Sequence, residues 1–128
     1  MATLSPWHGH FLQLARYNAW ATQRLLDAIE PVSDVDYRRD MKLFFKSIHG
    51  TLNHLLVGEH RLWQRRFASG ESPTVALDTE VEPQRDRLAQ ALKDGAATWE
   101  PLMASWPAER FDGQLSYTNM RGQALSLP

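Results

Sequence analysis

The 128-residue chain contains no cysteine, which excludes disulfide bonds, thiolate metal ligands and a cysteine nucleophile. A chain without disulfides suits a reducing compartment, so we expect a cytoplasmic protein. No apolar run approaches the roughly 18 residues that cross a bilayer, and the first residues lack the basic stretch and apolar core of a signal peptide. We therefore expect no membrane partner.

An excess of charge of one sign is also missing. Lys and Arg number 14 against 15 Asp and Glu, and the formal net charge is −1 at pH 7. This balance provides no basic field for nucleic acid and no DNA-recognition motif is present, so we expect no nucleic-acid partner. The local basic group of Arg61, Arg65 and Arg66 is typical of the solvated end of an amphipathic helix, and it also suits a phosphate site.

The common catalytic motifs are absent as well. The chain has no HEXXH pattern, no glycine-rich phosphate loop, no GxSxG elbow and no EF-hand loop. What it does have is material for one core, because 43% of its residues are hydrophobic and it includes five Trp, five Phe and three Tyr. This length is near the common size of a domain, so we predict a single domain over residues 1–128.

Apolar periodicity predicts a first helix over residues 7–30. Ser5 is suited to be its N-cap and Pro6 to be its first helical residue. The stripe that we expect to face the core consists of Phe11, Leu14, Ala15, Asn18, Ala21, Leu25 and Ile29. Asn18 is polar, and a polar group on a core face needs a partner, so we expect it to form a hydrogen bond across the bundle.

Two more helices and a hairpin follow. The second helix is predicted from about Leu43 to Phe67, and a loop covers residues 68–80. The third is predicted from Val81 to Trp106, with a kink or a break at Pro101. The segment 113–125 alternates polar and apolar residues around turn signals and predicts a small β-hairpin.

These elements predict an all-α fold. Their apolar faces are wide, about 100° on the second helix, and faces this wide favour an up-and-down four-helix bundle over three helices. Only three long helices are accounted for, so we expect the last helix of the bundle to be missing from this chain.

His54 is the histidine best placed for a metal. It lies at the margin of the apolar face, one turn from Gly50 and Gly58, and the two glycines predict space beside the imidazole. A half-buried histidine bonded to a neighbouring helix is the alternative. His49 and His60 lie about 16 Å apart along the helix, too far to share one ion.

Glu59 is predicted on the core side of the same helix. A buried carboxylate needs a partner, which we expect to be Asn18, an arginine, or an imidazole N–H next to a metal. Trp20 and Trp63 are interpreted as core or interface aromatics.

Three segments carry a family resemblance: YNAWATQRLLDAI (17–29), SIHGTLNHLLVGEHRLWQRRF (47–67) and LSYTNMRGQAL (115–125). In this order they resemble the DinB-like family, often called damage-inducible DinB proteins. The resemblance implies a four-helix bundle with a three-histidine metal site, of which one ligand matches His54. The other two sit in an HxxxH pattern on the family's last helix, and this chain has no HxxxH after residue 60.

The resemblance also implies what such a protein does. A three-imidazole site suits Zn²⁺, Ni²⁺, Fe²⁺ or Mn²⁺, and family branches include thiol S-transferases. It therefore implies a metal-dependent hydrolase or thiol S-transferase with a small-molecule or thiol substrate, and a homodimer. Because a single imidazole has no chelate effect, we expect weak or absent metal binding by this chain. The alternative is a non-catalytic helical-bundle protein that acts through homodimerisation.

Overall fold

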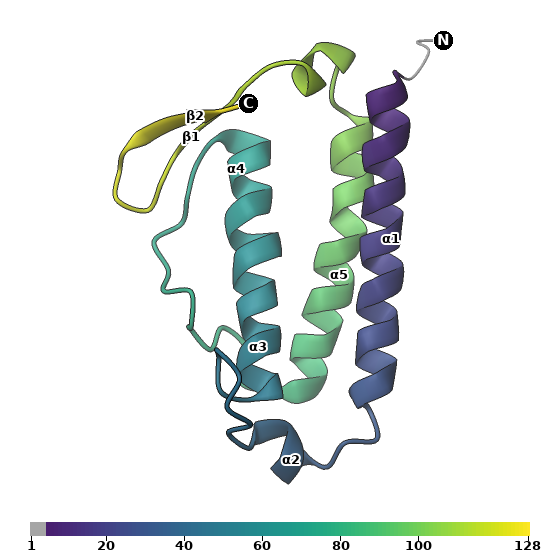
Figure 1. Ribbon diagram of the computed structural model, residues 1–128, viewed down its shortest axis with the longest axis vertical. Coiled ribbons are helices and arrows are strands. Elements are labelled where there is room, and N and C mark those ends of the chain that lie inside the picture. The colour runs from purple at the N-terminus through teal and green to yellow at the C-terminus, as the bar shows by residue number, and fades with distance from the viewer. Residues whose placement is uncertain (1–4) are drawn as a thin grey trace.

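The computed structural model describes residues 5–128 and is mostly helical, with one two-stranded antiparallel sheet (Figure 1). The elements in chain order are α1 (Pro6–Ile29), α2 (Asp34–Arg38), α3 (Ile48–Leu55), the π-helix η1 (Leu56–Trp63), α4 (Gln64–Ser69), α5 (Arg85–Ala104), the 3-10 helix η2 (Ala108–Phe111), β1 (Leu115–Thr118) and β2 (Ala124–Leu127). The predicted hairpin is confirmed, with Leu115 opposite Leu127 at its open end. Among the described helices, none combines the length and apolarity that crossing a membrane requires.

The start of α1 follows the prediction, but its buried face is rotated. Ser5 Oγ accepts the His8 N–H at 3.3 Å, which confirms the N-cap. The side chains that α1 buries include Leu12 and Leu26, whereas Leu14 and Leu25 of the predicted stripe are 47% and 43% exposed. The prediction is wrong for these two leucines because α5 packs against the neighbouring side of α1.

The second predicted helix is a rod in which α3, η1 and α4 follow one another without interruption from residue 48 to residue 69. Its start at Leu43 was predicted too early. Ser47 is the N-cap and accepts the Gly50 N–H at 2.9 Å, while Lys42 and Lys46 have φ values of 60° and 71°. A right-handed helix does not accommodate these left-handed conformations, so the helix begins only after them.

The third helix, α5, is unbroken from Arg85 to Ala104. It begins later than the predicted Val81 because the backbone of Glu82 is bonded to the side chain of Asn53 on α3. Of the kink or break predicted at Pro101, the break is wrong, because one helix contains this residue. Pro101 lies in the last turn, where it removes a single N–H donor and the helix continues for three more residues.

The connectivity differs from the predicted up-and-down order. Arg85, at the start of α5, donates to the Ile29 carbonyl at the end of α1, so these two helices are antiparallel. The rod runs parallel to α5, since His60 meets Trp99 further along both. The segment 70–84 makes this possible by returning alongside the rod to its start (Figure 1). The core between the helices comprises Leu26, Tyr37, Leu52, Leu56, Leu88 and Leu92.

Candidate functional site

His54 lies in the last turn of α3, and one ring nitrogen is held by the backbone. Its Nδ1 is 2.9 Å from the carbonyl oxygen of Leu77 in the segment 70–84. A carbonyl only accepts hydrogen bonds, so Nδ1 carries the proton. In the neutral imidazole Nε2 then has a free lone pair, which is the form that binds a metal ion through Nε2.

The imidazole plane of His54 is fixed from one side by an aromatic ring. Phe45 stacks on it with ring centroids 3.8 Å apart and an angle of 16° between the planes. A Cβ added at Gly58 would lie 3.8 Å from both Nε2 and Cε1, so this glycine borders Nε2, as predicted. The role predicted for Gly50 is wrong, because a Cβ there would overlap the Phe45 carbonyl rather than the imidazole.

The predicted alternative for His54 is correct in burial and wrong in partner. The side chain is half-buried, but it is bonded to a loop carbonyl and not to a neighbouring helix. A cavity of about 360 Å³ adjoins its two contact residues and is lined by Phe44, Phe45, Lys46, Gly50, Leu77 and Asp78. The two residues that contact the imidazole, Phe45 and Leu77, thus border a space that admits a small molecule, while His54 itself does not line it.

Glu59 has the partner that the sequence predicted. Asn18 Nδ2 donates to Glu59 Oε2 at 3.4 Å, which confirms a hydrogen bond across the bundle from α1 to η1. His60 Nε2 lies 3.6 Å from the same oxygen. The Glu59 side chain is only half-buried, which fits a carboxylate that needs no opposite charge.

His60 is buried against α5. Its Nδ1 accepts the indole N–H of Trp99 at 3.0 Å, and a Cβ added at Gly95 would lie 2.5 Å from its Cγ. Burial, together with a smaller effect of the nearby positive charge of Arg61, lowers the pKa of His60 from 6.5 to about 4. A histidine that stays neutral and has its Nδ1 occupied stabilises packing between helices.

His49 is likewise held by its neighbours. Its Nδ1 is 2.8 Å from the Tyr37 hydroxyl and its Nε2 is 2.7 Å from Glu80 Oε1. Burial raises the pKa of Tyr37 from 10.0 to about 12, so the phenol keeps its proton. Within residues 5–128 no three His, Asp or Glu side chains come together as a metal site would require. The described residues thus form no three-ligand site around His54.

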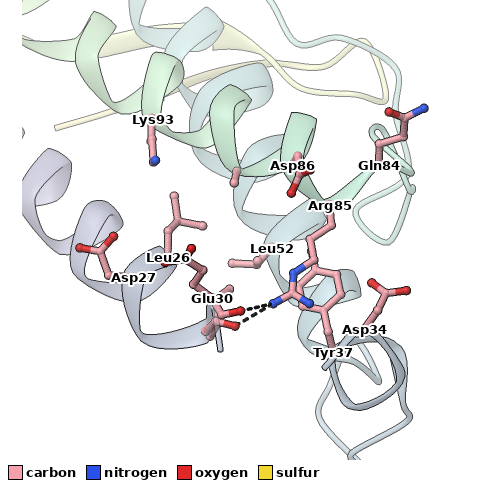
Figure 2. Close-up of a pocket in the computed structure, with 12 residues that line it drawn as sticks. Leu26, Asp27, Glu30, Asp34, Tyr37, Leu52, Gln84, Arg85, Asp86 and Lys93 are labelled. Carbon is pink, nitrogen blue, oxygen red and sulfur yellow. Dashed lines mark hydrogen bonds between the residues drawn. The ribbon is translucent and has the colours of Figure 1, made fainter. Parts of the chain in front are cut away.

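A second cavity, of about 590 Å³, lies away from His54 and was not predicted. It is bordered by the end of α1, α2, α3 and the start of α5, so no local sequence pattern marks it. Arg85 spans it: its guanidinium donates to the Ile29 carbonyl at 2.7 Å and lies 4.2 Å from the Tyr37 ring centroid (Figure 2). Arg85 therefore caps the negative C-terminal end of α1.

Comparison with known proteins gives one match. A sequence model of the DinB family matches residues 3–123. No curated protein and no solved structure matches the chain. The matched range covers nearly the whole chain, including His54, the rod and the first strand of the hairpin. The chain belongs to the DinB family.

Proposed function

We propose that this protein binds a divalent transition metal and that His54 supplies one of the ligands. The observation that supports the proposal is the hydrogen bond from His54 Nδ1 to the Leu77 carbonyl, which leaves Nε2 as a free lone pair beside Gly58. Ligating histidines commonly donate their other N–H to a carbonyl or carboxylate, which fixes the tautomer. His54 fits the role of one imidazole ligand.

The described residues offer no group of three ligands, and a single imidazole holds an ion only weakly, so further ligands are needed. We propose that two further imidazoles come from a helix that packs on the groove between α1 and the rod, completing a four-helix bundle. A cavity of about 130 Å³ marks this groove, and Asn18, Leu25, Leu55 and Glu59 are among the residues that line it. The exposure of Leu14 and Leu25 supports the same placement, since a fourth helix would bury both.

The proposed ion is Zn²⁺, Ni²⁺, Fe²⁺ or Mn²⁺, all of which accept imidazole nitrogen. Such an ion, when bound, supplies a Lewis acid that lowers the pKa of a water or thiol. We propose that the protein is a metal-dependent hydrolase or thiol S-transferase acting on a small molecule. This chain itself supplies the fixed imidazole of His54 and the cavity of about 360 Å³ that Phe45 and Leu77 line.

The test is the metal content of the full-length protein purified without chelator. We expect a stoichiometric divalent metal, and we expect its loss in His54→Ala. His10→Ala is the matched control, because His10 is exposed and belongs to α1, away from the rod. Purified wild-type protein without stoichiometric metal, or a His54→Ala protein with the same content, contradicts the proposal.

A second candidate function is homodimerisation through α1. Five large apolar side chains of this helix are exposed: Trp7, Leu14, Tyr17, Trp20 and Leu25. Exposed apolar surface of this kind is typical of an interface. Sedimentation equilibrium over a range of concentrations is expected to show a dimer that Leu14→Glu with Leu25→Glu dissociates. A wild-type monomer at all concentrations removes this candidate.

A further inference from the structure

Side chains of α3 hold the segment 70–84 against the rod at three points. His49 contacts the Glu80 carboxylate, Asn53 contacts the backbone of Glu82, and His54 contacts the Leu77 carbonyl. The segment contains no helix or strand, and Figure 1 shows it running beside the rod. Its path over α3 therefore depends on these contacts.

Asn53 is the most buried of the three residues that make these attachments. Its side chain is 1% exposed, and its amide forms two hydrogen bonds with one backbone unit. The Glu82 N–H donates to Asn53 Oδ1 at 2.9 Å, and Asn53 Nδ2 donates to the Glu82 carbonyl at 3.1 Å. Such a pair needs a donor and an acceptor at fixed spacing, which a primary amide provides and a carboxylate or an alkyl group does not.

This attachment lies five residues after Leu77, whose carbonyl sets the tautomer of His54. Glu80 is also held, through the contact of its carboxylate with His49, but the pair at Glu82 holds the backbone of the segment itself. The Phe45 ring limits how far the imidazole tilts, but a stacked ring makes no distinction between the two tautomers. The tautomer thus depends on where the backbone of Leu77 lies, and Asn53 anchors that backbone at Glu82.

We propose that Asn53 is a positioning residue that fixes His54 in the Nδ1–H tautomer, by anchoring the segment 70–84 so that Leu77 accepts from Nδ1. Metal binding through the free Nε2 rests on the proposed function, whereas the positioning of His54 by Asn53 does not. The tautomer itself is a property of the protein without metal, so it is measured independently.

The test is nitrogen NMR of uniformly ¹⁵N-labelled protein without metal, above neutral pH, which reports the protonated ring nitrogen of each histidine. In the wild type we expect His54 to be Nδ1–H. In Asn53→Ala we expect a mixture in which Nε2–H is prominent, because neutral imidazole in water favours that form. Asn119→Ala is the matched control: Asn119 bonds to the Gln123 backbone in the hairpin turn, and its loss leaves the His54 tautomer unchanged.

If Asn53→Ala does not fold, Asn53→Ser serves in its place, since its hydroxyl keeps one polar group at the site. A wild-type His54 in the Nε2–H form overturns the proposal. So does a folded Asn53 variant that keeps pure Nδ1–H.

Titration with Ni²⁺ separates the two proposals. We expect Asn53→Ala to bind Ni²⁺ about 10–100-fold more weakly than the wild-type full-length protein, the usual effect of losing a group that orients a ligand. If the tautomer changes as expected while the wild type binds no Ni²⁺, the positioning role stands and the proposed function fails. If the wild type binds Ni²⁺ and Asn53→Ala binds it with equal affinity, Asn53 does not help to position His54 for the metal.

Discussion

At the scale of single residues, the histidines of the rod differ in what their nitrogens contact. His49 and His60 have buried rings whose contacts lie within the fold, whereas His54 has one nitrogen bonded to a carbonyl and one beside a glycine. This difference makes His54 the residue suited to bind something from outside. Its position at the margin of the apolar face was predictable from the sequence. The Leu77 carbonyl was not, because a loop contact 23 residues away leaves no periodic signal.

The contact between His60 and Gly95 makes a stability prediction. A methyl at residue 95 would lie 2.5 Å from the His60 Cγ, and both groups are enclosed between helices. We expect Gly95→Ala to lower the free energy of unfolding by about 1–2 kcal/mol, since overpacking outweighs the better helix propensity of Ala. Gly9→Ala is the control: a Cβ at Gly9 meets no atom within 4 Å, so this change is expected to stabilise by up to about 1 kcal/mol. Urea denaturation measures both, and a neutral or stabilising Gly95→Ala contradicts the packing.

The lowered pKa of His60 predicts a pH dependence. In the unfolded state the His60 imidazole gains a proton below pH 6.5, whereas in the folded state it gains the proton only near pH 4. The unfolded chain therefore binds more protons between these values, and the stability that is full above pH 6.5 falls as the pH drops toward 4. A shift of this size corresponds to about 3 kcal/mol.

The check compares urea denaturation of the wild type and His60→Gln at pH values across that window. The variant still offers an acceptor to Trp99 but has no group that titrates there. For each protein the free energy of unfolding is plotted against pH. The difference between the two slopes gives the contribution of His60, because the carboxylates, including the neighbouring Glu59, are the same in both proteins. Parallel slopes would mean that His60 titrates normally in the folded protein.

At the scale of elements, the predicted helices exist but several of their ends lie elsewhere. The cap formed by Ser5 and Pro6 was readable because it is local. The starts of α3 and α5 were not, because Lys46 adopts a left-handed conformation and Glu82 is held by Asn53 from another element. The π-helical part of the rod also carries no sequence signal that we recognise.

The end of α1 gives the prediction that belongs to this scale. Arg85 donates to the carbonyls of Ile29, the last residue of α1, and of Val32 just after it, at 2.7 Å and 2.8 Å. The guanidinium thus adds a charged donor where the carbonyls of a helix run out of intrahelical partners. We expect Arg85→Met to destabilise by about 2 kcal/mol, the range for hydrogen bonds to a charged group. Arg87 is exposed and lies two residues after Arg85 in α5. The free energy of unfolding of Arg87→Met is expected to stay within about 0.5 kcal/mol of the wild-type value. Thermal denaturation of both variants measures the two losses of stability. Equal losses in Arg85→Met and Arg87→Met would show that Arg85 does not cap α1.

At the scale of the whole molecule, the arrangement of helices follows from one long connection. A mostly helical chain of this family was predictable from periodicity and from the segments that resemble DinB proteins. The parallel order of the rod and α5 was not, because it depends on the path of the segment 70–84, whose attachments to His49, Asn53 and His54 form only in the folded protein. The same segment sets both the topology and the orientation of the candidate ligand.

Binding of a divalent metal by His54 Nε2 can be measured with Co²⁺, because the visible spectrum of this ion reports its ligands. We predict that the full-length wild-type protein titrated with Co²⁺ shows a saturable visible absorption band at one equivalent. We predict that His54→Ala weakens or abolishes this band, while His10→Ala leaves it intact. A band of equal strength and affinity in His54→Ala, or no band in the wild type, would mean that His54 Nε2 does not bind the ion.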